Sequence, residues 1–429
     1  MTSAAIPLDS TLTLNRPEDR LYIALTLIVF AAGVLLSHSL LGNDRIIFNL
    51  EMLFVLLYTL EFRKFPALLQ LLKKHPATCG LLLLWTISML VSVYRSPFID
   101  DGLAYEMIGL SRYTDILAHV LFSLYVWSFL THYNRSLKLL LFTIPFSALC
   151  VGLFIFVTAW QIDNPEYLEP LWWSNPPFNS HARHTGYQVT AALSICICWF
   201  IGSENRSHKV WQLLMLTGLW TFIFWLGGRG GMLAVMTVCL ILVCLLYSRH
   251  QTTEAIGFIK IMLACSLLGL VLAEVLAVFS WNGLISALAR TTEAENLNGA
   301  ASGRLNIWKK ALQSVQQHPV FGMGPRGYLL MPHVTVTGQP HNAFVQFLVE
   351  WGVTGTALFL GLWLQLFRQG CRKHIAATKR LSQTPLLAGA VIVSLSVLGL
   401  VDGTYYYAQP SFYLALAFGI WLAPERQPD

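Results

Sequence analysis

Long apolar runs recur along this whole chain, and a helix needs roughly 17–25 such residues to cross the ~30 Å hydrocarbon core of a membrane. Only 12% of the 429 residues are charged, whereas a soluble domain of this size needs far more charge on its surface. The sequence therefore predicts an all-α integral membrane protein that forms one polytopic domain over residues 1–429. We predict about twelve membrane-spanning helices, at residues 21–41, 46–62, 77–94, 113–132, 137–160, 185–203, 209–227, 230–248, 256–279, 343–367, 385–401 and 411–423.

The distribution of Lys and Arg over the short loops predicts the orientation of the chain, because cytoplasmic loops carry an excess of these residues. Loops on the side of the N-terminus hold most of them, including Arg63, Lys64, Arg135, Arg249 and Arg372. We therefore expect both termini in the cytoplasm, and the long segments 161–184 and 280–342 on the other side of the membrane. The modest net charge of +6 is accounted for by the Lys and Arg residues that set this orientation, and we expect no nucleic-acid partner.

The outer loop 280–342, between the ninth and tenth predicted spans, is much longer than the others, and long loops in compact proteins are usually functional. It contains the stretch "SGRLNIWKKALQSVQQHPVFG", which predicts a helix with Ser302 as its N-cap and an end at His318 and Pro319. We expect this helix to lie across the outer end of the bundle as a lid.

A histidine stands at the outer end of the tenth span, in "GQPHNAFVQFLVEWGVTG". We expect His341 or Asn342 to cap this helix, whose N-terminus attracts anions through its dipole and unpaired N–H groups. A neutral His341 at that position can act as a base. The plainer alternative is an interfacial capping residue with no chemistry. Asp402, at the outer end of the eleventh span, is expected either to orient His341 or to cap a turn.

Arg229 lies in "WLGGRGGML", where two spans meet on the outer side with almost no loop between them. A charge costs ~2.5–3.5 kcal/mol at the membrane centre and less near an end, so it usually faces a cavity or a partner. The alternative is an arginine that only reaches the interface with its head group. Arg304, in the first turn of the lid helix, is on the same side, and Arg183 and Arg326 are weaker candidates.

The guanidinium group of an arginine binds phosphate through two parallel hydrogen bonds and stays charged. Arg229, Arg304 and His341 together would therefore suit a reaction with a pyrophosphate leaving group, and no metal would be needed. An alternative metal site is the pair Asp100 and Asp101 in "IDDG", but no histidine or further carboxylate follows at a suggestive spacing. We expect no metal and no cofactor.

Three stretches resemble elements of the bacterial O-antigen ligases. "HNAFVQFLVEWGVTG" is similar to a signature of histidine, a polar residue, nine residues, a glycine, two residues and a small residue or tyrosine, with Gly352 and Gly355 at the last two positions. "GGRGGML" around Arg229 resembles a Ser-Arg-Gly element, with glycine in place of serine. "SGRLNIWKKAL…HPVFGMGPRGY" resembles an outer-loop element, with Arg304 at its arginine. We also expect the two glycines to let helices pack closely in lipid.

This resemblance implies an inner-membrane glycosyltransferase with a GT-C-like fold and an active site that faces the periplasm. Such an enzyme moves O-antigen from undecaprenyl pyrophosphate to lipid A–core, which completes lipopolysaccharide, without a metal. His341 would be the base or would position the acceptor, and Arg229 and Arg304 would hold the pyrophosphate. Direct displacement of the pyrophosphate would invert the anomeric carbon.

Other functions stay open at this point. An O-antigen polymerase of the same superfamily uses lipid-linked sugar as both donor and acceptor. A protein O-oligosaccharyltransferase commonly carries a large extra domain at the C-terminus, whereas this chain stops shortly after its last predicted span. A polysaccharide-lipid transporter would show inverted repeats or broken helices with buried charges near the membrane midplane, and Glu51 and Glu350 are the hints of such charges. Glu350, roughly 13 Å inside the tenth helix, is such a residue, and we expect it to pair within the bundle.

Overall fold

The computed structural model describes residues 16–34, 44–62, 72–97, 103–133, 137–174, 182–202, 206–331, 339–375 and 383–423. Within these ranges every regular element is a helix, which confirms the predicted all-α class. The helices are α1 (Pro17–Val34), α2 (Asp44–Phe62), α4 (Pro76–Tyr94), α5 (Leu103–His132), α6 (Leu137–Trp160), α7 (Pro165–Ser174), α8 (Ala182–Gly202), α9 (Arg206–Trp225), α10 (Arg229–Ser248), α11 (Thr252–Val275), α12 (Gly283–Thr292), α13 (Leu297–Ala300), α14 (Arg304–Gln317), η3 (Gly327–Leu330), α15 (Ala343–Ile375), α16 (Gln383–Gly399) and α17 (Ala408–Leu422).

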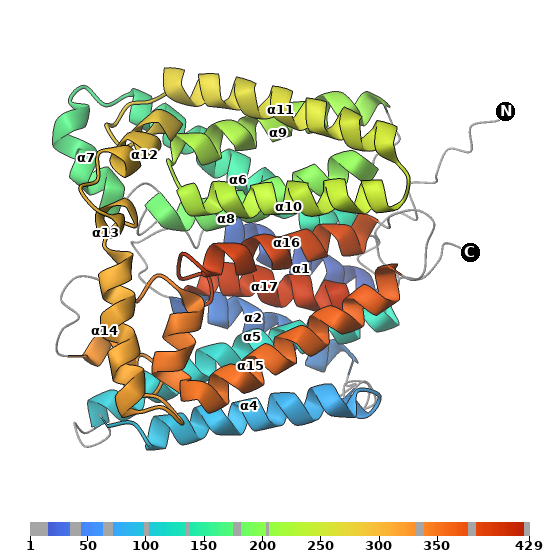
Figure 1. Ribbon diagram of the computed structural model, residues 1–429. Coiled ribbons are helices and arrows are strands. Elements are labelled where there is room, and N and C mark those ends of the chain that lie inside the picture. The colour runs from blue at the N-terminus through green and yellow to red at the C-terminus, as the bar shows by residue number, and fades with distance from the viewer. Residues whose placement is uncertain are drawn as a thin grey trace.

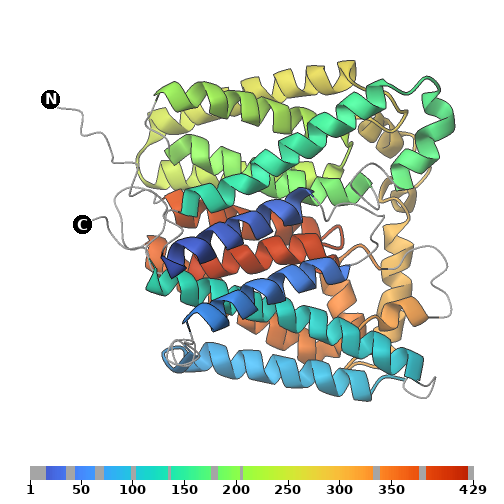
Figure 2. The same ribbon diagram turned by 180° about the vertical axis from the view of Figure 1, so that it is seen from behind.

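The long helices lie side by side, and the short helices α7, α12, α13 and α14 gather at one end of them (Figures 1 and 2). Each of the twelve predicted spans overlaps one long helix. Among the described residues, seven helices are long and apolar enough to cross a membrane, which is consistent with a multi-pass membrane protein. These are Pro76–Tyr94, Ile108–His132, Leu139–Trp160, His184–Gly202, Arg229–Ser248, Thr252–Val275 and Ala343–Arg372. The number of twelve spans and the GT-C-like architecture stay predictions.

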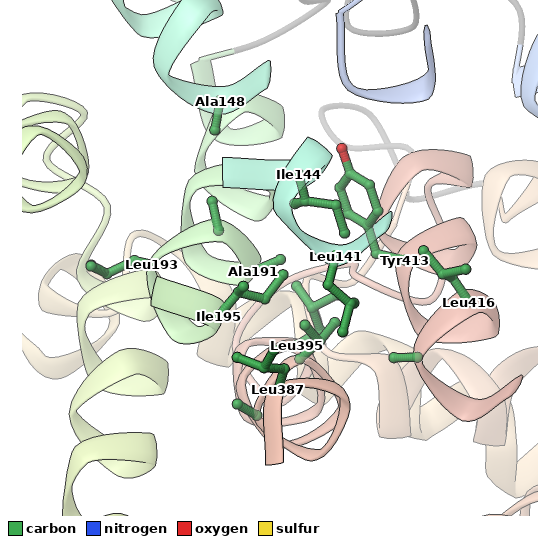
Figure 3. Close-up of a cluster of buried hydrophobic side chains, with 14 of the residues drawn as sticks. Leu141, Ile144, Ala148, Ala191, Leu193, Ile195, Leu387, Leu395, Tyr413 and Leu416 are labelled. Carbon is green, nitrogen blue, oxygen red and sulfur yellow. The ribbon is translucent and has the colours of Figure 1, made fainter. Parts of the chain in front are cut away.

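The core of the bundle forms where α6, α8, α16 and α17 meet, and Figure 3 shows side chains from all four helices in contact there. Ile195 of α8 and Leu395 of α16 are completely buried in it. By contrast, α10 and α11 expose large apolar side chains on their outer faces, such as Leu240 (63% exposed) and Val275 (67% exposed). Such surfaces suit lipid, in which a helix satisfies its own backbone hydrogen bonds.

Among the described residues, the turns and short helices that connect the long helices lie at two opposite ends of the bundle (Figures 1 and 2). At one end Arg112 Nη2 donates to the carbonyl of Tyr405 (2.9 Å), and Ser280 N donates to Glu169 Oε2 (3.2 Å). At the other end Gln369 Nε2 donates to Thr78 Oγ1 (2.7 Å). We call the first end, with α12, α13 and α14, the outer end. Which compartment each end faces stays a prediction.

The predicted lid helix is α14, and it runs across the ends of the long helices instead of along them (Figure 1). It ends at Gln317, before His318 and Pro319, as predicted. The predicted cap is wrong: Gly303, in the left-handed region with φ 77°, is the N-cap. The hydroxyl of Ser302 instead accepts a hydrogen bond from Arg229 Nη2 (2.9 Å).

The tenth predicted span is not one continuous helix, because α15 is broken at Gly352 (φ 64°, ψ −170°). The segment that follows α14 satisfies the freed backbone groups. Val353 N donates to the carbonyl of Pro319 (2.8 Å), and Met323 N donates to the carbonyl of Val349 (2.7 Å). We call these hydrogen bonds between 319–324 and 349–354 the clasp. They tie the end of the lid helix to the middle of α15.

We expected Gly352 to allow close packing between helices, but the clasp gives a different reason for a glycine at this position. A Cβ at this position would lie 2.4 Å from the carbonyl oxygen of Val320, and the positive φ favours glycine. The second signature glycine, Gly355, does face another helix, since its Cβ would lie 3.0 Å from Ser88 Oγ of α4. Gly352 is therefore required by the helix break, whereas Gly355 is required by packing.

We predict that Gly352→Ala destabilises the protein by about 2 kcal/mol or more, because an alanine in this positive-φ extended conformation costs ~1–3 kcal/mol before the clash with Val320 is counted. Thermal unfolding in detergent, followed by fluorescence, would measure this. The control is Gly257→Ala in α11, where a Cβ meets nothing within 4 Å and alanine should be neutral or stabilising. Equal unfolding temperatures of Gly352→Ala and the wild type would contradict the clasp.

Candidate functional site

The start of α15 is built by Asn342, one of the two residues expected to cap it. Asn342 Oδ1 accepts a hydrogen bond from Val345 N (3.0 Å), and Asn342 Nδ2 donates to the carbonyl of Leu400 (2.8 Å). One side chain therefore caps α15 and joins it to the end of α16. His341, which precedes the cap, has left-handed backbone geometry with φ 51°.

His341 pairs with Asp402 across 61 residues of sequence. Its Nδ1 lies 3.0 Å from Asp402 Oδ1, and the two side chains are 13% and 9% exposed. Asp402 Oδ1 also accepts a hydrogen bond from Gly403 N (2.9 Å), which fixes the carboxylate. Because Nδ1 faces the carboxylate, Nε2 is the ring nitrogen that a substrate can reach.

Arg229 begins α10 and binds the outer loop. Its Nη1 donates to Thr291 Oγ1 and to the carbonyl of Ala300 (3.0 Å), and its Nη2 donates to Ser302 Oγ (2.9 Å). All three acceptors are neutral and come from the outer loop. The guanidinium thus fastens this loop to the N-terminus of α10.

The glycines around Arg229 allow α10 to begin between two other helices. A Cβ at Gly230 would lie 2.8 Å from Val401 Cγ2, and a Cβ at Gly231 would lie 2.7 Å from Thr190 Oγ1. Larger residues would push Arg229 away from the segment that carries Asp402. Close approach therefore explains Gly230 and Gly231, whereas a Cβ at Gly228 would meet nothing within 4 Å.

One cavity at the outer end brings the main candidates together. Arg229, Arg304 and Asp402 all line it, and Asp402 connects it to His341. Arg290 of α12 lines the same cavity, and its Nη1 donates to Ser286 Oγ (3.1 Å). Three guanidinium groups and one carboxylate leave this cavity positive, which suits a ligand with several negative charges.

Sequence reasoning missed Arg290, because it stands in no recognisable motif and only the fold of the outer loop brings it to the cavity. It also missed Arg112, which is only 3% exposed in α5. Arg112 Nη2 donates to the carbonyl of Tyr405 (2.9 Å), and its guanidinium lies 5.3 Å from the centre of the Tyr406 ring. A buried arginine thus holds the segment on which Asp402 lies.

The weaker candidates lie elsewhere. Arg326 does not line the cavity, and its charge acts, together with that of Arg112, on the buried carboxylate of Glu350. Glu350 also accepts a hydrogen bond from Gln346 Nε2 (3.2 Å), which places it in a polar cluster beneath the start of α15. Arg183 falls in the first turn of α8, but its side chain lies outside the described residues.

Asp100 and Asp101, the alternative metal site, also lie outside the described residues. Over the part of the chain that is described, no three His, Cys, Asp or Glu side chains come together in a way that could hold a metal ion.

The lid helix contacts the site directly. Trp308 Nε1 of α14 donates to the carbonyl of Pro340 (2.8 Å), the residue before His341. Arg304, in the first turn of the same helix, reaches the cavity. One short helix therefore touches both the histidine turn and the arginine cavity.

Residues 213–360 match a protein-family model described as O-antigen ligase. This match includes Arg229, Arg304 and His341. This part, about a third of the chain, is similar to the O-antigen ligase superfamily. Members of this superfamily are glycosyltransferase-like enzymes. The chain is also 23% identical to a Haemophilus influenzae protein over 293 residues, which are 64% of this chain and 68% of that protein. That protein is described only as uncharacterized.

We predict that Arg229→Ala loosens the outer loop. A hydrogen bond from a charged group contributes ~1.5–3 kcal/mol. The loss of even one should therefore increase the fraction of molecules in which the outer loop is detached from α10 by at least ~10-fold. Limited trypsin digestion would measure this as faster cleavage at Arg290, Arg304 or Lys309. Arg372→Ala is the matched control, because this arginine is exposed at the other end of the bundle. Equal cleavage rates for the wild type and Arg229→Ala would show that these contacts do not hold the loop.

Proposed function

We propose that this protein is an O-antigen ligase, which transfers O-antigen polysaccharide from undecaprenyl pyrophosphate to the lipid A–core oligosaccharide. The single observation that carries the proposal is the arrangement at the outer end. A histidine–aspartate pair lies beside a cavity lined by Arg229, Arg290 and Arg304. The pair can move a proton, and the arginines can hold a diphosphate, which are the two tasks of this reaction.

His341 is the base in this scheme. Its Nε2 takes the proton of the acceptor hydroxyl as the oxygen attacks the anomeric carbon. Asp402 holds Nδ1 and stabilises the imidazolium that forms, so its carboxylate makes the transfer easier without taking the proton itself. The attack opposite the leaving group inverts the configuration of the anomeric carbon.

The arginines act on the leaving group. Negative charge grows on the pyrophosphate as the glycosidic bond breaks, and guanidinium groups stabilise it through charge-assisted hydrogen bonds. Phosphate oxygens would compete well with the neutral oxygens of Thr291, Ala300 and Ser302 for Arg229, because they carry negative charge and can bind a guanidinium bidentately. The scheme needs no metal, since the arginines supply the positive charge.

The place of the cavity suits two lipid-borne substrates. It opens at the ends of the helices, where head groups of lipids in the bilayer would meet. We assign this end to the periplasm and the enzyme to the bacterial inner membrane, with both termini in the cytoplasm. The Lys and Arg distribution over the loops supports this orientation.

Purified protein tests the proposal when it is given undecaprenyl-pyrophosphate-linked glycan, lipid A–core and an excess of chelator. We expect glycan on the lipid A–core with the wild type, and a loss of ~10²–10⁴-fold in rate with His341→Ala. Growth of the lipid-linked chain without transfer to the core would identify a polymerase instead. If His341→Ala transferred glycan at the wild-type rate, His341 would not be the base of this reaction.

Asp402→Asn tests the pair separately. We expect kcat to fall by ~10²-fold or more and the KM for the lipid-linked donor to change by less than ~3-fold, because the amide cannot stabilise an imidazolium. Glu169→Gln is the matched control, since this carboxylate binds Ser280 at the same end but does not line the cavity. A rise in KM with unchanged kcat would assign Asp402 to binding alone.

A further inference from the structure

A second crevice lies at the end of the bundle opposite the proposed active site. It is lined by side chains of α8, α10, α15, α16 and α17, and nearly all of them are apolar. Each helix contributes the part that lies at this inner end, for example Leu242 of α10, Phe367 of α15 and Trp421 of α17. The proposed transfer reaction uses none of these residues.

The length of the crevice matches one leaflet of a membrane. Its wall on α10 runs from Val238 to Arg249, which corresponds to about 16 Å at ~1.5 Å per residue. The hydrocarbon core of a bilayer is ~30 Å thick, so half of it is about 15 Å. The crevice therefore has room along its length for an acyl chain that runs from the helix ends to the bilayer midplane.

The crevice is open toward the lipid-facing surface. Ile241 forms part of its wall and is 40% exposed, and the adjacent Leu240 points outward from the same helix. Val393 of α16 is half-buried in the opposite part of the wall. A lipid could thus enter from the side, between helices.

Arg249 is the one charged residue of the described chain that lines the crevice. It follows the last residue of α10 and lines the crevice at the inner end. Its Nη1 is buried and has no hydrogen-bond partner among the described residues. No Asp or Glu of the described chain lines this crevice. An apolar slot with an unpaired guanidinium at its end complements a molecule with a hydrocarbon chain and an anionic head.

We infer that this crevice binds an anionic glycerophospholipid, with one acyl chain in the slot and the phosphate on Arg249. Basic pockets between membrane helices on the cytoplasmic side take such head groups. A bound lipid would fill the space between α10, α15 and α16 and hold their inner ends together. The site is independent of the proposed transfer reaction, which takes place at the other end.

Delipidated full-length protein in detergent tests this inference by titration with phosphatidylglycerol, with thermal unfolding and native mass spectrometry as readouts. We expect phosphatidylglycerol to raise the unfolding temperature and to remain bound to the wild type. Arg249→Gln should weaken the apparent affinity by at least tenfold, and Arg249→Lys should keep part of it. Arg372→Gln is the matched control, because this arginine is exposed at the same end of the bundle.

Val393→Trp supplies a second test, because it keeps the charge of Arg249 and fills the slot. We expect this variant to lose bound phosphatidylglycerol as well. The inference would be overturned if both variants bound phosphatidylglycerol like the wild type, or if Arg372→Gln lost as much affinity as Arg249→Gln. It would also be overturned if phosphatidylethanolamine, or glycerol phosphate alone, stabilised the wild type equally.

Discussion

The clasp between residues 319–324 and the break in α15 is the interaction on which the outer end of this protein depends. A broken helix at membrane depth must satisfy its backbone groups within the protein, because lipid offers no hydrogen bonds. Here the segment after α14 supplies the partners, and Ser92 Oγ adds a hydrogen bond to the carbonyl of Glu350 (2.7 Å). The same contacts fix the lid helix against the helix that begins beside His341.

Two further contacts complete this arrangement. Trp308 binds the carbonyl of Pro340, and Arg229 binds the loop that precedes α14. The outer loop is therefore attached before, along and after its helix. Because these attachments converge on the histidine turn and on the start of α10, they bring Arg304 and Arg229 to one cavity with Asp402. Proposed chemistry and outer-loop folding thus depend on the same few side chains.

Composition and end signals were enough to predict the long helices and α14, but not the short helices α7, α12 and α13. The apolar runs gave the long helices, and the Pro at position 319 marked the end of α14. The Ser302 cap was wrongly predicted because Arg229, distant in sequence, binds its hydroxyl and Gly303 provides the left-handed turn. The break at Gly352 was missed because a glycine with positive φ looks in sequence like one that packs against a neighbouring helix.

The candidate site likewise contains residues that the sequence predicts and residues that it does not. Arg229, Arg304 and His341 each stand in a local pattern that sequence reasoning can recognise. Arg290 and Arg112 do not, since their positions follow only from tertiary contacts. The sequence left two roles open for Asp402, and only the folded chain brings its carboxylate to 3.0 Å from His341 Nδ1.

The most direct test of the account is an experimental structure of the full chain with undecaprenyl pyrophosphate bound. We expect the diphosphate in the cavity, within hydrogen-bond distance of the guanidinium groups of Arg229 and Arg304 and on the same side as His341 Nε2. Arg229 would then bind phosphate oxygens in place of at least one outer-loop oxygen. A diphosphate bound elsewhere, for instance beside Arg249 at the inner end, would contradict the proposed site.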